Sequence, residues 1–203
     1  MAISLQKGQR VDLTKGNPGL SKIMVGLGWD PVENRGGGGL LGSLFGGGGG
    51  SNVDCDASVI MLGAGDKLKN NRDVIYFGNL KSSDGSVQHS GDNLTGQGEG
   101  DDEQVHIELS RIPSDIQKLV FVVNIYDAVK RRQHFGMIRN AFIRVVNPTN
   151  GQELIHYNLT DDYNGRTSLI VGEIYRHGAD WKFGAVGTGT NAAGLSEVVR
   201  TYS

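Results

Sequence analysis

The chain has 203 residues, enough for one folded domain with a sizeable hydrophobic core. Its 20 Lys and Arg residues nearly balance 22 Asp and Glu residues, for a formal net charge of −2. This balance gives no general electrostatic reason to bind nucleic acid or an anionic membrane, and the one basic cluster, Lys130 to Arg132, is typical of a solvated face.

The N-terminal stretch MAISLQKGQRVDL lacks the basic and apolar regions of a secretory signal. No segment approaches the roughly 20 apolar residues that a membrane-spanning helix requires. The single cysteine, Cys55, cannot form an intramolecular disulfide, as expected for a reducing compartment. We therefore expect a cytoplasmic protein without a membrane span.

Alternation of apolar and polar residues dominates the chain and predicts half-buried strands. The alternating segments lie at 3–5, 11–13, 23–29, 58–62, 74–80, 105–109, 118–126, 140–146, 153–159, 168–175 and 181–187. So many short strands, joined by Gly, Asn and Asp turns, predict a mainly all-β fold: a two-sheet antiparallel β-sandwich forming one domain over residues 1–203.

Helical spacing is scarce. Residues 127–135 predict one short helix. The tail predicts a second helix that docks on the domain, through Leu195, Val198, Val199 and Tyr202. Neither segment carries obvious chemistry.

Residues 35–52, RGGGGLLGSLFGGGGGSN, interrupt the strand pattern. Glycine loses the most backbone entropy on ordering, so we expect a flexible insertion. The apolar LLGSLF between the glycine runs either folds back on the domain, which is the simpler interpretation, or meets a partner or membrane surface. The Gly-Lys-Ser/Thr ending of a phosphate-binding P-loop is absent from the segment.

Two acidic clusters follow this insertion. In VDCDAS, Asp54 and Asp56 alternate with apolar residues, so on a strand both carboxylates project from one face, about 7 Å apart. The stretch GDNLTGQGEGDDE, residues 91–103, collects further acids between glycines: Asp92, Glu99, Asp101, Asp102 and Glu103. Neither cluster contains Lys or Arg, so the carboxylates would raise one another's pKa unless another counter-charge is present.

A metal ion is a natural counter-charge for these clusters. Carboxylates, with Asn79, Asn93, Thr95 and glycine carbonyls nearby, offer only oxygen ligands and favour a hard cation. A flexible loop with many oxygens fits Ca²⁺ better than Mg²⁺, whereas scattered single histidines disfavour zinc. The EF-hand is excluded because Leu94 and Gln97 occupy its ligand and glycine positions. Solvated acidic turns are the alternative interpretation.

No motif identifies a catalytic centre. DCDAS resembles the start of haloacid-dehalogenase phosphatases, but Gly-Ser-Asn rather than an apolar strand precedes it. Cys55 lies on the apolar side of its segment, which predicts a buried, inert thiol, and Trp29 and Trp181 are predicted core aromatics. A divalent-metal enzyme acting on a phosphate-containing substrate and a nucleotide-binding module are the alternatives to a non-enzymatic metal-binding protein.

Several segments together resemble the TerD family of tellurium-resistance and general-stress proteins: MVGLGWD, DCDASVIML, GDNLTGQGEGDDE, KLVFVVNIYDA and GEIYRHGADWKFGAVG. The resemblance covers nearly the whole chain. It implies a β-sandwich that binds Ca²⁺, here one or two ions, through acidic loops at one end. It also implies a cytosolic bacterial stress protein without a firmly attached catalytic activity. Other tellurium-resistance proteins, including a membrane-embedded one, are the expected partners.

Carried over to the matching positions, the resemblance implies a set of metal ligands: Asp54, Asp56, Asn79, Asp92, Asn93, Glu99, Asp101, Asp102 and Glu103. Asp30 and Asp84 are secondary candidates. Residues 35–52 depart from the family pattern, in which a short and more polar connection precedes the first acidic pair. The sequence therefore predicts a calcium-ordered interaction module.

Overall fold

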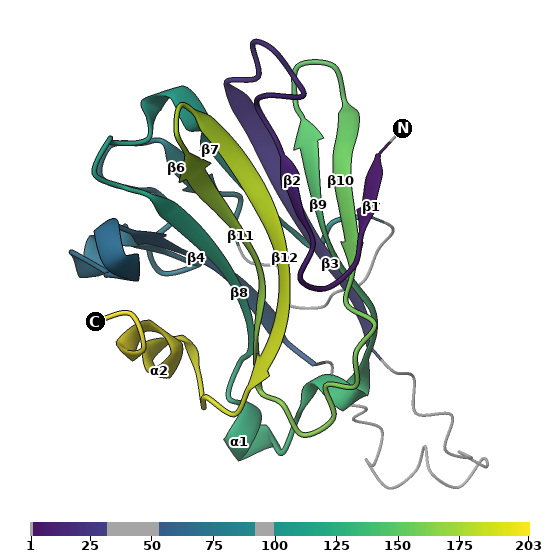
Figure 1. The fold of residues 1–203 in the computed structure, drawn as a ribbon. Helices are drawn as coiled ribbons and strands as arrows, with labels where there is room; N and C mark the ends of the chain where they lie inside the picture. Colours follow the sequence, from purple (N-terminus) through teal and green to yellow (C-terminus); the bar gives the residue numbers. More distant parts are fainter. Residues whose placement is uncertain (1, 32–52, 92–99) are drawn as a thin grey trace, which may run out of the picture.

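The computed structural model describes residues 2–31, 53–91 and 100–203 (Figure 1). Two six-stranded sheets pack face to face. Sheet A has the order β1 (Ile3–Leu5), β10 (Gln152–Asn158), β9 (Ile138–Asn147), β3 (Lys22–Pro31), β7 (Glu103–Glu108) and β6 (Val87–His89). Sheet B has the order β2 (Arg10–Asp12), β12 (Asp180–Thr190), β11 (Ser168–His177), β8 (Lys118–Ile125), β4 (Cys55–Leu62) and β5 (Val74–Ile75). The predicted two-sheet sandwich is confirmed.

Strand pairing is antiparallel except at one edge, where β1 runs parallel to β10. All four edge strands are only two or three residues long. Short edges leave few unpaired backbone groups, which limits edge-to-edge aggregation. The predicted flexible insertion at 35–52, with its LLGSLF segment, lies outside the described residues.

Helices are few and short, as predicted. The segment at 127–135 forms only α1 (Ala128–Arg131), because Asp127 and Arg132 adopt left-handed backbone angles, with φ of 51° and 54°. In the described parts of the chain, four 3-10 turns complete the helical content: Ala64–Asp66, Asn71–Asp73, Leu109–Arg111 and Phe135–Met137. Within the part of the chain described, no helix has the length and apolar character to cross a membrane.

The main core lies between the sheets and contains both tryptophans, Trp29 and Trp181, which are 5% and 4% exposed. A second apolar cluster covers the outer face of sheet B, where α2 (Leu195–Arg200) packs beside β4 and β8 (Figure 1). The residues of the tail that were predicted to dock belong to this cluster: Leu195, Val198, Val199 and Tyr202. The C-terminal helix is confirmed.

One predicted strand is wrong in length. The pattern at 74–80 continues as a strand only through Ile75, and Tyr76 and Asn79 then close a tight turn through reciprocal backbone hydrogen bonds of 3.1 and 2.8 Å. The side-chain amide of Asn79 fixes this turn by donating to the carbonyls of Arg72 and Val74. Strand β4 pairs with β8 along its whole length, but among the described residues its other edge has no partner strand beyond Val59, toward Cys55.

Gly26 provides space on the outer face of sheet A. The alternate residues of β3 point into the core, so the missing side chain of Gly26 would point outward. The carboxylate of Asp101 occupies this space, and a Cβ at position 26 would overlap it. Glycine is required here because of the close approach, and no left-handed backbone angle is involved.

We predict that Gly26→Ala lowers the free energy of unfolding by about 2 kcal/mol, the usual effect of forcing an atom into a filled site. The added methyl group displaces Asp101 and disrupts its ion pair with Arg144 on β9. Urea unfolding measures the change. Gly16→Ala is the control, since its nearest neighbour would lie 3.7 Å away, and an equal loss in both variants would contradict the packing argument.

Candidate metal-binding site

Asp54 and Asp56 lie at the start of β4, on the side away from the main core. Val53, Cys55 and Ala57 belong to that core, so the alternating acids face outward from sheet B, as predicted. Both are nevertheless buried, at 9% and 4% exposure. Burial without water requires that these carboxylates be neutralised or hydrogen-bonded.

Asp56 is paired across the sheet with Asn124 of β8. The amide nitrogen Nδ2 of Asn124 donates to Oδ2 of Asp56 at 3.3 Å. Asp54 meets a cation from α1: its Oδ2 lies 3.5 Å from Nη1 of Arg131. The backbone N–H of Tyr126 also donates to the carbonyl of Asp54 at 2.8 Å. Asp54 therefore connects β4 to the segment that leads into α1.

Two buried oxygen atoms beside Asp56 have no hydrogen-bond partner among the described residues. They are Oδ1 of Asn124 and Oγ of Ser58, in side chains that are 6% and 1% exposed. Buried polar atoms in folded proteins are nearly always paired, so these two oxygens are available to a further hydrogen-bond donor or a cation. Asn124 was not predicted as a site residue, although an Asn within the apolar run KLVFVVNIY was the available signal.

Glu103 lies between the sheets, where it closes the open edge of β4. Its Oε2 accepts the backbone N–H of Ala57 at 2.6 Å, and Nε2 of His89 lies 3.2 Å from the carbonyl of Ala57 and 3.3 Å from Oε2 of Glu103. The N–H of Gly91 donates to Nδ1 of His89, so the imidazole proton lies on Nε2. These two side chains replace the backbone bonds that a longer β5 would have made.

Asp101 has a basic partner that the sequence did not reveal. Its two carboxylate oxygens accept from Nε and Nη2 of Arg144 at 2.7 and 2.9 Å, which raises the pKa of Arg144. The amide of Gln104 donates to the same carboxylate at 3.1 Å. The charge of Asp101 is thus balanced on the outer face of sheet A by a guanidinium from β9.

Asp102 lies near the end of β3, where Oδ2 accepts the backbone N–H of Trp29 at 2.7 Å. Burial raises the pKa of this carboxyl group, and the nearby charges of Asp30, Glu103 and Asp101 raise it further. Asp30 itself is exposed and accepts a 2.7 Å hydrogen bond from Asn140.

The other predicted ligands divide into two groups. Asn79 and Asp84 stabilise turns: Asn79 bonds to the carbonyls of Arg72 and Val74, and Asp84 accepts the N–H of Ser86 at 2.7 Å. Asp92, Asn93 and Glu99 lie outside the described residues. Among the residues that are described, no three Asp, Glu, His or Cys side chains converge as a metal site. The structure places Asp56 against Asn124, with Asp54 and Ser58 two positions away on either side along the same face of the segment.

Cys55 lies on the core side of β4 and has no exposed surface. Burial raises the pKa of its thiol well above the ordinary value, and the charges of Asp56 and Asp54 act in the same direction. Because the thiolate is the reactive form, this cysteine is unsuited to redox or nucleophilic chemistry. The predicted burial of this thiol is confirmed.

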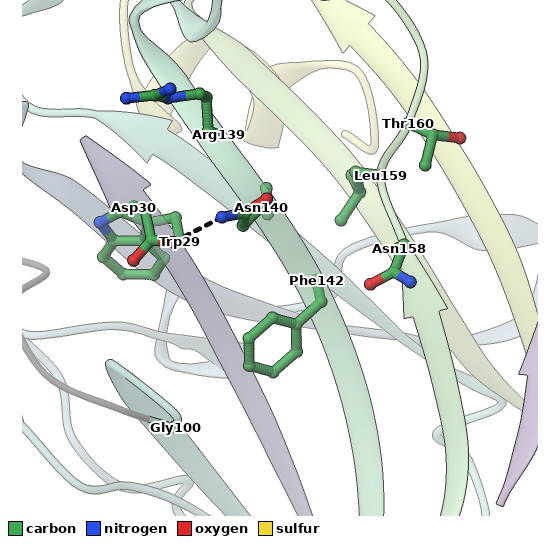
Figure 2. A pocket seen from close by; sticks show the side chains of 10 residues that line it. Trp29, Asp30, Gly100, Arg139, Asn140, Phe142, Asn158, Leu159 and Thr160 are labelled. Atoms are coloured by element: carbon green, nitrogen blue, oxygen red, sulfur yellow. Dashed lines mark hydrogen bonds between the residues drawn. The ribbon is translucent and has the colours of Figure 1, made fainter. Parts of the chain in front are cut away.

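A separate open pocket of about 720 Å³ lies at the end of β3 (Figure 2). Its lining combines charged, amide and apolar groups: Trp29, Asp30, Gly100, Arg139, Asn140, Ala141, Phe142, Asn158, Leu159 and Thr160. Asn140 lies in the left-handed region, with φ of 54°, and its amide holds Asp30 on the wall (Figure 2). Of the described residues that line this pocket, Asp30 alone carries a carboxylate, and that carboxylate is already bonded to the amide of Asn140.

Comparison with known proteins places the chain among stress proteins. The family model of the TerD domain matches residues 1–202. Stress response protein SCP2 of Bacillus subtilis (strain 168) is 63% identical over 202 residues, covering 100% of both chains. The tellurium resistance protein TerD of Alcaligenes sp is 45% identical over 202 residues, covering 100% of this chain and 97% of that protein.

The fold also recurs in a solved structure. A homologue of telluride resistance protein (TerD) from Streptomyces coelicolor A3(2) aligns with a TM-score of 0.66, covering 91% of this chain and 99% of its own. Its sequence identity is 22%, so this likeness supports the fold alone. The family match over 1–202 and the full-length relatives show that the chain belongs to the TerD domain family of stress-response and tellurium-resistance proteins.

Proposed function

We propose that this protein is a cytoplasmic, non-enzymatic calcium-binding module of the stress response associated with tellurite resistance. The ion would bind at the buried end of sheet B, beside Asp54 and Asp56. The observation that carries the proposal is that the buried oxygens of Asn124 and Ser58, next to the carboxylate of Asp56, have no hydrogen-bond partner among the described residues.

The chemistry of these donors fits a hard cation. Carboxylate, amide and hydroxyl oxygens are the ligands of Ca²⁺, which takes six to eight of them in flexible geometry. Asp54, Asp56 and Asn124 could supply part of such a shell. Asp92, Asn93 and Glu99, which the family resemblance adds, remain proposed ligands. Asp101 and Glu103 already have protein partners in Arg144 and the Ala57 N–H.

Ion binding at Asp54 would act on a surface element. Arg131 of α1 lies 3.5 Å from this carboxylate, and Tyr126 bonds to the same residue through its backbone. A divalent ion would compete with Arg131 for Asp54 and so reposition α1. In this way calcium could control contact with a partner, which we propose to be another tellurium-resistance protein, including a membrane-embedded one.

The direct test is calorimetric titration of metal-stripped protein with Ca²⁺ and, separately, Mg²⁺. We predict Ca²⁺ binding that is stronger than Mg²⁺ binding and that weakens at least about tenfold in Asp56→Asn, which removes a charged ligand. Bound ion also raises the melting temperature by mass action, because the unfolded chain lacks the site.

Asp101→Asn is the matched control for that titration. Arg144 already balances Asp101, so this variant should lose stability while it retains calcium affinity. Absence of heat and of thermal stabilisation with Ca²⁺ would overturn the proposal. A clear preference for Mg²⁺ would instead support the rival, a metal-dependent enzyme acting on a phosphate-containing substrate.

Asp102 gives a pH-dependent prediction for the metal-free protein. Burial raises its pKa, so the folded state holds this proton more tightly than the unfolded chain does. Stability from this group is therefore present below pH of about 4 and is lost as pH rises through the raised pKa. Asp102→Asn should show a smaller decline in urea unfolding free energy from pH 4 to 7 in chelator. Parallel pH profiles would contradict the assignment.

A further inference from the structure

Four exposed apolar side chains gather on two turns beside the proposed ion site. We call Phe77, Leu80, Tyr126 and Val129 the loop-tip patch; they are 43%, 44%, 42% and 67% exposed. Of the described residues, only one other large apolar side chain is as exposed, Ile3 on the distant edge strand β1. Exposed apolar side chains that cluster in this way usually mark a contact surface.

The two turns of the patch are in contact. The rings of Phe77 and Tyr126 meet edge to face at 6.5 Å, and Tyr76 packs against Phe77 in the same manner at 5.3 Å. The guanidinium of Arg131 lies 5.1 Å from the centre of the Tyr126 ring. The patch is therefore one surface built from residues that are about fifty positions apart in the chain.

Backbone geometry holds these side chains outward. The turn at Tyr76 is closed by reciprocal hydrogen bonds with Asn79, and Asp127, which precedes α1, has a left-handed φ of 51°. Each turn directly follows the last paired residue of its strand, so the side chains project beyond the sheet. They are exposed on ordered structure.

Basic residues surround the patch. Residues 71–81 and 126–132 contain five basic residues (Arg72, Lys81, Lys130, Arg131, Arg132) and two acidic ones (Asp73, Asp127). With Asp54, which lies 3.5 Å from Arg131, the local net charge is +2 in a chain of −2. Within the described structure, Arg72, Lys81 and Arg132 make no ion pair. Lys130 is 83% exposed and lies 3.7 Å from Asp127.

We propose that the loop-tip patch docks on an anionic lipid bilayer. Aromatic side chains favour the interface between hydrocarbon and water, and flanking Lys and Arg bind anionic headgroups while their stems lie along apolar surface. Four side chains at loop tips can insert into a bilayer. They are a small part of the roughly 800 Å² per partner that a stable protein interface buries.

This inference goes beyond the proposed calcium function, and its test is made in the absence of the ion. The overall charge of −2 gave no reason to expect a membrane partner, but the two turns concentrate positive charge locally. The Debye length at physiological salt is about 8 Å, so the local charge governs attraction to a surface.

The test is sedimentation of the full chain with vesicles in chelator, at low and physiological salt. We predict binding to vesicles containing phosphatidylglycerol and not to vesicles of phosphatidylcholine alone, with affinity that falls as salt rises. Arg72→Gln/Lys81→Gln/Arg132→Gln should weaken binding about fivefold for each charge removed. Phe77→Ser/Val129→Ser should also weaken it.

Ile3→Ser is the matched control, since it removes an exposed apolar side chain far from the patch and should leave binding unchanged. Circular dichroism and urea unfolding confirm that each variant is folded. Equal binding to both vesicle types, or binding unchanged in both patch variants, would overturn the proposal. A dimer in solution that Phe77→Ser/Val129→Ser dissociates would identify a second copy as the occupant instead.

Discussion

The end of the sandwich that carries the candidate site depends on how the edge of β4 is completed. β5 pairs with β4 only at Val59 and Ile60, so the backbone of Ala57 has no strand beside it on that edge. Glu103 and His89 from sheet A bind its N–H and its carbonyl. A buried backbone group without a partner costs about 1–3 kcal/mol, so this contact stabilises the edge and joins the two sheets.

That contact also determines what faces outward. The contact fixes β4 at Ala57. The two neighbouring residues, Asp56 and Ser58, point to the other face and pair with Asn124 and Val122 of β8. Because β5 ends so early, the chain turns at Tyr76 and presents Phe77 next to Tyr126. The candidate ion site and the loop-tip patch are therefore consequences of one short strand.

The three acidic residues at 101–103 are consecutive in the sequence, but each lies in a different environment in the structure. Asp101 pairs with Arg144 on the outer face of sheet A, Asp102 bonds to the backbone of Trp29, and Glu103 points between the sheets. Alternation would place Asp101 and Glu103, which are two positions apart, on one face. Asp101 instead precedes β7, and its carboxylate lies over Gly26 on the outer face of sheet A. The partner of Asp101 was unpredictable because Arg144 lies 43 residues away and meets it only through the register of β9, β3 and β7.

The sequence predicted strands well where the alternation of apolar and polar residues extends over many positions, and poorly where a strand is short. Most strands, the docking of α2 and the outward pairing of Asp54 with Asp56 followed from spacing. β6 is three residues long and has too few positions to show alternation. The run at 74–80 has the alternation of a strand, but the side chain of Asn79 donates hydrogen bonds that stabilise a turn there instead. Asn124 was missed because a single polar residue in an apolar strand acquires meaning only from its cross-strand neighbour Asp56.

The central claim is that a cation neutralises the carboxylates of Asp54 and Asp56 together with the buried oxygen of Asn124. The most direct measurement is a crystal structure of the protein grown with Ca²⁺. The account predicts an ion 2.3–2.6 Å from oxygens of Asp54, Asp56 and Asn124, with Arg131 moved away from Asp54. A calcium-saturated crystal in which no ion contacts these oxygens and Arg131 remains on Asp54 would contradict it.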